Sequence, residues 1–343
     1  MTVVGPIPGL HVRGGGVAFP RDVNASAPEL TNDDVHAMVL GPDWREQLQV
    51  RGRDNDHAER VWGVRRRQWC RGLDGTVWVQ TTELAEMAAR RALEDAGLDK
   101  VDLLIVATST PDRMTATSAA RVAKSLGLTC GAFDIHGAGA GAISALITAA
   151  QFLLGGLSTV LVVAADAVSP IVAPDDLNGR LLFAGGAAAV VVERRGNTRG
   201  LLGGLMNSAA VDGRPFTVPG PLPPKPDGDY VFQQPDAEYR YALYHGWKLL
   251  MESMRRKFIA PVDLFLPYPI TLPQIAAAAE ALDVPLEHTW HTLGEHGCVG
   301  CAGPLVSLVE RRARFGLDGT VALAAVAGGL TGAALLWSFS EDK

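Results

Sequence analysis

Uninterrupted apolar segments that alternate with helical patterns constrain the fold of this chain most. Residues 101–108 read VDLLIVAT and residues 159–165 read TVLVVAA, without the polar alternation of a strand that has one face in water. Such strands belong to a sheet that helices cover on both faces. Around them, residues 82–96, 115–126 and 137–155 carry apolar side chains at helical spacing. The pattern predicts an α/β fold.

The second half of the chain repeats this order of elements. Helices are expected at residues 241–257, 273–282 and 303–314, and strands at 263–267, 320–327 and 333–338. Because both halves run helix, strand, helix, strand, we expect an internal duplication of structure.

The domain organisation follows from this repeat. Residues 1–200 form the predicted N-terminal half, with an inserted polar segment at 28–72, and residues 241–343 form the C-terminal half. Between them, residues 201–240 are predicted to be a proline-rich surface excursion. Its central part, residues 212–236, is either a plain linker or a lid over a site.

Composition excludes several classes of protein. The chain has 343 residues, 48% of them apolar, and a net charge of −6, which excludes a disordered protein and argues against a nucleic-acid partner. Four cysteines do not make a disulfide scaffold, and the N-terminus lacks the pattern of a signal peptide, so a cytoplasmic location is expected. The apolar run 132–154 contains Asp134, His136 and Gln151, so it is predicted to be a buried strand and helix, not a membrane span.

Five segments spread along the chain carry a family resemblance. They are WGVRRR at 62–67, ELAEMAARRALEDAGLDKVDLLIVATST at 83–110, AFDIHGAGAGAISAL at 132–146, LLFAGGAAAVVV at 181–192 and VAGGLTGAAL at 326–335. In this order they resemble ketoacyl-ACP synthase III of the thiolase superfamily. The resemblance implies a five-layered αβαβα thiolase fold with two pseudo-duplicated halves, a homodimer and no cofactor. It also implies an enzyme that condenses an acyl-CoA with a malonyl-ACP by means of a Cys, a His and an Asn.

All three positions that the resemblance identifies as catalytic are changed here. The nucleophile position in FDIHGAG is Gly139. The histidine position, after LFLP, is Tyr268, and the asparagine position, after His296-Gly297, is Cys298. Since a glycine has no side chain to acylate and Tyr and Cys are poor donors to an enolate, we expect no normal decarboxylating condensation.

Backbone groups survive the loss of these side chains. The N–H of Gly139, together with an N–H from Gly328 or Gly329, would still form an oxyanion hole. Removal of the cysteine side chain is also expected to open space beside the start of the helix. An alcohol or amine acceptor in that space would permit direct acyl transfer in a ternary complex.

Cys298 and Cys301 form a C-x-x-C motif with several interpretations. They are either two small buried cysteines, a redox pair, or half of a zinc site completed by His291 and His296. Cys298 is alternatively a relocated nucleophile, with His296 or Tyr268 as its base. We expect that no metal is bound.

Two further side chains near the expected site have open roles. His136, just before the helix start, is either a hydrogen-bonded residue near a dimer interface or a general base. Tyr268 either fills space left by the family histidine or donates a hydrogen bond.

The residues expected to bind CoA or the carrier protein are altered as well. Two positions that the resemblance identifies as arginines are Val61 and Pro273, which weakens binding of CoA. The residues left to meet CoA phosphate or an acidic carrier protein are Arg65, Arg66, Arg67, Trp247 and Lys248.

The sequence is therefore compatible with two functions. The preferred one is an acyltransferase of specialised metabolism that moves an acyl group from a carrier-protein or CoA thioester to a small O- or N-nucleophile, because the glycine-rich loops remain and His136, Tyr268 and Cys298 look specific. The alternative is a catalytically inactive thiolase-fold subunit in a heterodimer with an active ketosynthase-like homologue.

Overall fold

Two sheets form the centre of the protein in the computed structural model, which describes residues 1–197, 200–209, 218, 237–258 and 260–339. The first sheet contains, in spatial order, β3 (Leu10–Ala18), β9 (Gly185–Arg194), β8 (Thr159–Ala167), β6 (Leu103–Ala107) and β7 (Gly131–Ile135). The second contains β1 (Thr2–Val4), β10 (Gly200–Ser208), β13 (Thr331–Ser338), β12 (Thr320–Ala327) and β11 (Leu264–Pro267), with β2 (Ile7–Pro8) beside β10.

The two sheets repeat one topology. In the first, β3 pairs antiparallel with β9 and β9 with β8, and β8 then pairs parallel with β6. In the second, β10 pairs antiparallel with β13 and β13 with β12, and β12 then pairs parallel with β11. The expected internal duplication is therefore present, and the first sheet carries one further parallel strand, β7, at its edge.

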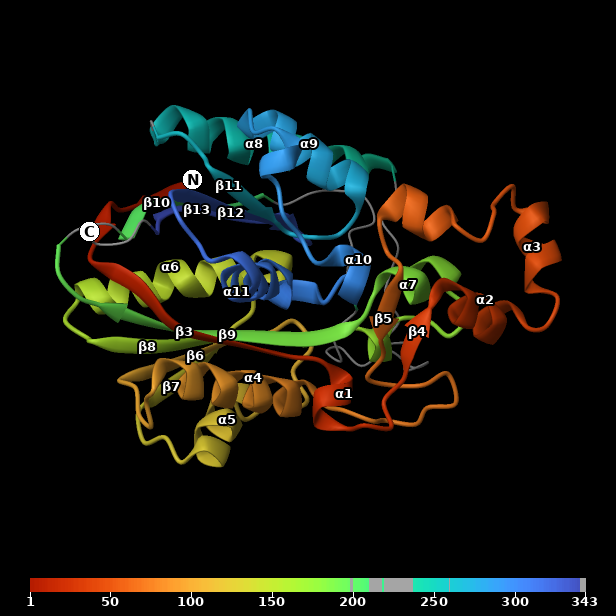
Figure 1. Cartoon of the computed structure of the whole chain (residues 1–343), viewed down its shortest axis with the longest axis horizontal. Helices are drawn as coiled ribbons and strands as arrows, with labels where there is room; N and C mark the ends of the chain where they lie inside the picture. The colour runs from red at the N-terminus through yellow and green to blue at the C-terminus, as the bar shows by residue number, and fades with distance from the viewer. Residues whose placement is uncertain (198–199, 210–217, 219–236, 259, 340–343) are drawn as a thin grey trace.

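Helices separate and cover the sheets in five layers (Figure 1). The helices α6 (Gly141–Leu154) and α11 (Gly303–Phe315) lie between the two sheets. The pair α4 (Thr81–Ala96) and α5 (Ser118–Leu126) covers the outer face of the first sheet, and the pair α8 (Ala237–Lys257) and α9 (Leu272–Leu282) covers that of the second. The αβαβα architecture predicted from the sequence is confirmed.

The glycine-rich N-terminal segment is a full strand, β3, and not the short strand and loop that its composition suggests. A Cβ atom on Gly16 would lie 2.4 Å from the Ala88 carbonyl oxygen of α4, and one on Gly15 would lie 3.1 Å from Val309 of α11. The glycines therefore let two helices approach the strand from opposite sides.

The apolar run 132–154 is confirmed as a strand followed by a buried helix, β7 and α6. The side chains of Ile143, Leu146 and Leu153 on α6 are buried between the sheets. Among the described residues, no helix is long and apolar enough to cross a membrane.

The boundary predicted at residue 200 is wrong in part. Residues 201–208 were assigned to the surface excursion but belong to β10, a central strand of the second sheet. The strand reads GLLGGLMNS, and its glycines hide the apolar pattern of a strand. β1 and β2, from the N-terminus, also pair with β10 in this second sheet. The proposed lid at 212–236 lies outside the described residues, apart from Val218.

The inserted segment 28–72 forms a lobe at one end of the molecule (Figure 1). It contains β4 (Glu29–Thr31), α2 (Asn32–Leu40), α3 (Trp44–Val50), the π-helix Ala58–Trp62 and β5 (Arg66–Gln68). Its own apolar cluster, centred on the buried side chains of Trp44 and Trp69, also takes in α7 (Leu177–Leu182).

Candidate active site

The three positions that the resemblance predicts to be catalytic come together in the folded chain. Gly139 lies in a short 3-10 helix, Ala138–Ala140, directly before α6, and Tyr268 follows the last residue of β11. Cys298 comes shortly after α10 (Leu293–His296). The hydroxyl group of Tyr268 lies 3.5 Å from the sulfur of Cys298, and a Cβ atom placed on Gly139 would lie 2.8 Å from two ring carbons of Tyr268.

The space expected beside Gly139 is not open. The ring of Tyr268 reaches it from one side, and the Cβ of Ala327, the last residue of β12, lies 2.8 Å from the same point. Carbon atoms in contact are about 3.5–4.0 Å apart, so any side chain at residue 139 would have to displace one of these groups. Tyr268 therefore fills the position that a nucleophile side chain would take.

Burial keeps the Tyr268–Cys298 pair in its neutral form. Burial, and then the neighbouring Cys298, raises the pKa of Tyr268 well above its ordinary value, and burial raises the pKa of Cys298 to about 11. A thiol attacks a thioester as the thiolate, which is scarce at neutral pH when the pKa is this high. The complete burial of Cys298, which keeps its thiol protonated, therefore argues against a relocated nucleophile at this residue.

Cys301 occupies a separate environment under the same loop. Its backbone N–H donates to a carboxylate oxygen of Asp166 at 2.7 Å, and its sulfur lies 3.4 Å from the carbonyl oxygen of Ala107. Burial, and then the charge of Asp166, raises the pKa of the Cys301 thiol well above its ordinary value. Both cysteines of the C-x-x-C motif are buried free thiols, as in the simplest interpretation of the motif.

Asp166 is a structural centre of the site that the sequence did not reveal. Its carboxylate is buried at the end of β8 and accepts hydrogen bonds from Thr108, the backbone N–H of Ser109, Thr110 and Cys301. Burial raises its pKa, although these donors oppose the rise. One carboxylate thus ties the end of β6 to the loop that carries Cys298. An Asp inside an apolar strand, AADAV, was the available signal.

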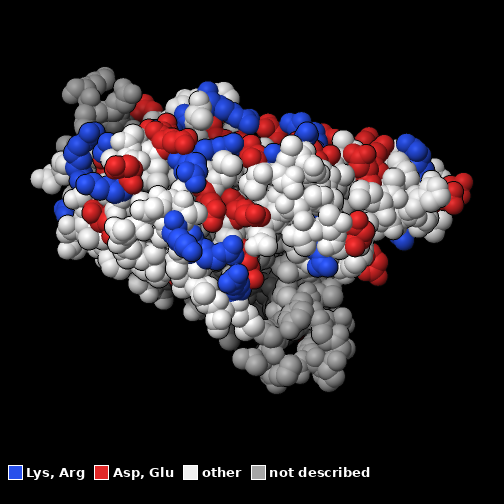
Figure 2. Space-filling view, turned by 90° about the horizontal axis from the view of Figure 1, so that it is seen from below, with Lys and Arg blue, Asp and Glu red and all other residues white. Residues whose placement is uncertain are grey.

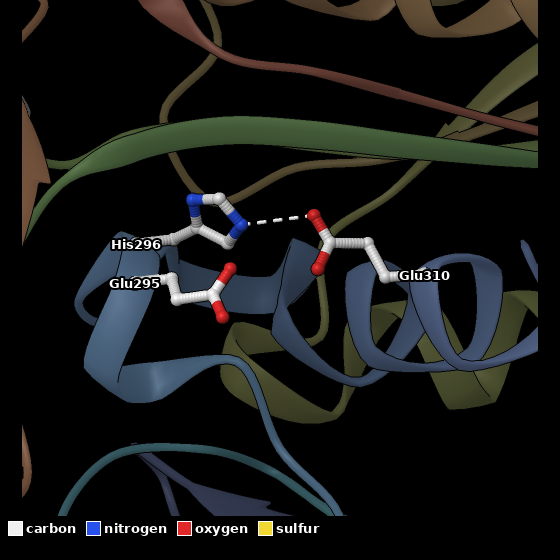
Figure 3. A group of neighbouring side chains, drawn as sticks. All are labelled: Glu295, His296 and Glu310. Atoms are coloured by element: carbon white, nitrogen blue, oxygen red, sulfur yellow. Dashed lines mark hydrogen bonds and ion pairs between the residues drawn. The ribbon is translucent and has the colours of Figure 1, made fainter. Parts of the chain in front are cut away.

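His296 is engaged elsewhere (Figure 3). Its Nε2 lies 2.9 Å from Oε1 of Glu310, and its ring stacks on Phe19 at 3.9 Å between centroids. The guanidinium of Arg314 bonds to Glu310 at 2.9 Å and to Glu295 at 2.8 Å. The structure therefore does not support His296 as the base for Cys298, whose sulfur contacts Tyr268.

Within the described part of the chain, Glu295, His296 and Glu310 are the one group of side chains spaced to share a metal ion. Arg314 pairs with both carboxylates, and His296 already contacts Glu310, so we assign no metal there. The alternative zinc site, with Cys298 and Cys301 completed by His291 and His296, is not assembled among these residues.

The remaining predicted residues of the catalytic centre are less constrained. His136 is exposed at the end of β7, and no hydrogen bond joins it to Tyr268 or Cys298. Gly328 and Gly329 lie in the turn between β12 and β13, directly after Ala327, which borders Gly139. An oxyanion hole from these backbone groups stays a prediction.

Two residues predicted to bind the donor are buried instead. Arg67 donates to the carbonyl oxygens of Leu30 and Leu181 and to the side chain of Asn32, and burial lowers its pKa to about 9. Trp247 is only 3% exposed and packs into the main core under α8. Neither can meet a carrier protein or CoA, because their side chains are committed to the fold.

Arg65, Arg66 and Lys248 are exposed, so they remain available to a donor. Arg66 faces Glu29 across the β4–β5 pair at 3.5 Å. On the face seen from below, Lys and Arg side chains stand in separate groups with Asp and Glu among them (Figure 2). That face carries no broad basic surface of the kind that binds polyanions.

Comparison with known proteins identifies the family. A family profile described as 3-Oxoacyl-[acyl-carrier-protein (ACP)] synthase III matches residues 133–209. The chain is 32% identical to Beta-ketoacyl-[acyl-carrier-protein] synthase III 2 of Streptomyces coelicolor over 307 residues, which cover 84% of this chain and 88% of the relative. It is 33% identical to Beta-ketoacyl-[acyl-carrier-protein] synthase III of Allorhizobium ampelinum over 350 residues, which cover 95% and 98%.

Solved structures agree with this relationship. The crystal structure of 3-oxoacyl-(acyl carrier protein) synthase III from Pseudomonas aeruginosa superposes with a TM-score of 0.79 at 25% identity, and the match covers 98% of this chain and 99% of that one. The priming beta-ketosynthase of the R1128 polyketide pathway shares the fold, with a TM-score of 0.78 at 22% identity over 99% of each chain. The chain therefore belongs to the beta-ketoacyl-[acyl-carrier-protein] synthase III family of acyl-transferring condensing enzymes.

Proposed function

We propose that this chain is a non-condensing member of the family, which serves as a subunit beside a homologous synthase with an intact catalytic centre. The observation that carries the proposal is the Tyr268 ring, which stands 2.8 Å from where a Cβ atom of residue 139 would lie. A condensing site needs a nucleophile at this point and room for its thioester. Here it has neither.

The other replaced side chains support the same conclusion. Decarboxylative condensation needs donors directed at the enolate oxygen of the malonyl group. The hydroxyl of Tyr268 is directed at Cys298 instead, and both groups are buried. The hydroxyl group of Tyr268 and the thiol of Cys298 contact each other, so neither is directed at a substrate.

Direct transfer to an alcohol or amine, the function preferred from the sequence, is less well supported. That route needs the thioester carbonyl and the acceptor to stand together beside the N–H of Gly139. The ring of Tyr268 and the Cβ of Ala327 meet at that place. Acyl transfer by the isolated chain is therefore an outcome that would contradict the proposal.

The free edge of the first sheet is evidence that a partner chain binds there. β7 pairs only with β6, and its other edge has no strand in the described structure. Beside it, Phe133 contacts Phe152 of α6, and the side chains of Phe152 and Leu154 are 41% and 48% exposed. An unpaired strand edge next to exposed apolar side chains is a surface on which another chain can add its own strand.

The donor of such an assembly is proposed to be an acyl carrier protein or an acyl-CoA, with condensation or transfer at the partner's centre. The relatives' names specify acyl-carrier-protein substrates. Exposed Arg65, Arg66 and Lys248 offer charges to an acidic carrier. Since this chain has lost all three catalytic side chains, we place the assembly in specialised metabolism, with a small molecule as its acceptor.

The test compares the isolated chain with the assembled one. The purified chain is incubated with acyl-CoAs, acyl-carrier proteins and malonyl thioesters. Intact-protein mass spectrometry then detects acyl adducts, and a separate assay measures CO₂ released by decarboxylation. We expect no adduct and no CO₂. The tagged chain, recovered from its native host, is expected to bring down in fixed stoichiometry a homologue with a Cys-His-Asn centre.

Two results would contradict the proposal. One is an acyl adduct, ester or amide product formed by the isolated chain. The other is recovery of the chain as a homodimer with no such homologue. The variant Cys298→Ser distinguishes acylation at this thiol from acylation elsewhere, since only an adduct on Cys298 is lost with the substitution.

A further inference from the structure

The three replaced positions form one contact group and not three independent losses. Tyr268 touches both of the others: its ring borders Gly139 and its hydroxyl meets the sulfur of Cys298 at 3.5 Å. The backbone N–H of Tyr268 donates to the Ala324 carbonyl of β12 at 2.8 Å, which holds the residue at the end of its strand. A side chain held in this way fills a fixed volume.

Three neighbours of the Tyr268 ring or hydroxyl group are small residues. Gly139 has no side chain, and Ala327 and Cys298 contribute only a methyl group and a thiol to the contact. None of them can expand into the volume of a phenol ring, so loss of the ring would leave a cavity and not a collapsed core. That cavity would be bordered by the thiol of Cys298 and by Gly139.

We infer that Tyr268 is an internal plug, a side chain that fills the expected catalytic pocket and shields the Cys298 thiol from electrophiles. This inference rests on the proposed function, since it concerns the same site. It adds that the side chain of one residue closes the centre, and that the ring, more than its hydroxyl group, does so.

The test measures access to Cys298 by alkylation with iodoacetamide at pH 8.5, followed by peptide mapping. In this reaction the sulfur forms a bond to the reagent's carbon, the carbon–iodine bond breaks, and iodide and a proton leave. We expect Tyr268→Ala to be alkylated at Cys298 at least tenfold faster than the unaltered chain. Cys70, which is buried beside Gly185, serves as the internal control and stays unlabelled.

Two further variants keep the result decisive. Tyr268→Phe keeps the ring and loses the hydroxyl group, so Cys298 should stay protected. Tyr268→His is smaller and polar, so it tests access even if the alanine variant fails to fold. Retention of the near-UV circular dichroism spectrum shows which variants are folded.

The inference is overturned if folded Tyr268→Ala or Tyr268→His leaves Cys298 as protected as in the unaltered chain. It is equally overturned if Tyr268→Phe is labelled as fast as the alanine variant, because the hydrogen bond would then provide the protection. Neither result depends on activity of the unaltered chain. Failure of the inference is therefore distinct from failure of the proposed function, which requires an acyl adduct or product from that chain.

Discussion

Single side chains decide what the catalytic centre can do. Gly139, Tyr268 and Cys298 stand at the positions that we predict to be catalytic, and in the structure the three residues fit one another sterically. A small residue at 139 accommodates the ring of Tyr268, and the hydroxyl of that ring meets a thiol. Substitution of one of these residues alone by the residue expected from the family should therefore lower the stability of the chain.

Gly139→Cys tests this dependence. The new Cβ would lie 2.8 Å from both Tyr268 and Ala327, so we expect the free energy of unfolding to fall by about 1–3 kcal/mol. Urea denaturation measures the change. In the background of Tyr268→Ala the same substitution should cost less, because only the contact with Ala327 remains, and a double-mutant cycle gives the coupling.

Neither the single variant Gly139→Cys nor its combination with Tyr268→Ala should condense acyl and malonyl thioesters, because the His and Asn positions remain changed. Robust condensation by Gly139→Cys alone would refute this account of the centre. Equal costs of the substitution in the two backgrounds would refute the steric coupling.

From the burial of Tyr268 we also predict how the stability of the chain depends on alkaline pH. Burial raises its pKa above the ordinary value of 10.0, so the folded state favours the neutral phenol. The unfolded chain ionises first as pH rises, and the chain should lose up to about 1.4 kcal/mol of stability per pH unit above 10.0 from this residue. Tyr268→Phe lacks this loss.

Urea titrations of the two chains between pH 7 and 11 test this prediction. The difference in stability between them should be constant up to pH 9.5 and should then shift in favour of Tyr268→Phe. A constant difference across the whole range would show that the phenol ionises as easily in the folded chain as in water.

Among the secondary-structure elements, β3 shows how glycine serves packing. Gly16 faces the backbone of α4, and Gly15 faces the flexible side chain of Val309 on α11. Helix backbone cannot move aside for a methyl group, whereas a valine can shift by a few tenths of an ångström. The two neighbouring glycines should therefore differ in their tolerance of alanine.

Gly16→Ala is expected to lower the free energy of unfolding by about 3 kcal/mol, since its Cβ would lie 2.4 Å from the Ala88 carbonyl oxygen. Gly15→Ala is the matched control and should change it by less than about 1 kcal/mol, because alanine is favoured over glycine in a strand. Chemical denaturation of both variants tests the order. A larger loss for Gly15→Ala would contradict the packing described for β3.

For the assembled protein, the β7 edge predicts where a partner binds. Phe152→Glu and Leu154→Glu place charges on side chains that are already 41% and 48% exposed, so the thermal stability of the isolated chain should change little. Light scattering and co-purification should show at least tenfold weaker association. Val50→Glu, at an 89% exposed site on the inserted lobe, is the control and should leave association unchanged. Undiminished association of the β7-edge variants would place the interface elsewhere.

Much of the fold was predictable because it depends on local patterns. Helices at 82–96 and 303–314 and strands at 263–267 and 320–327 were predicted within one residue of their observed bounds. β10 was missed because its glycines break the apolar pattern of GLLGGLMNS. Its place in the sheet comes from pairing with β13, which lies more than 120 residues later in the chain.

Residue patterns alone predicted an α/β fold with an internal duplication, and the family resemblance added the five-layered architecture and a glycine, Gly139, at the expected nucleophile position. Tertiary structure decided the rest: that the ring of Tyr268 occupies the space left by the nucleophile, that Arg67 is buried, and that His296 pairs with Glu310. The physical reason is that burial and contact depend on residues far apart in the chain. Gly139 and Tyr268 are separated by 128 intervening residues, and only the packing of the two sheets around α6 brings them together.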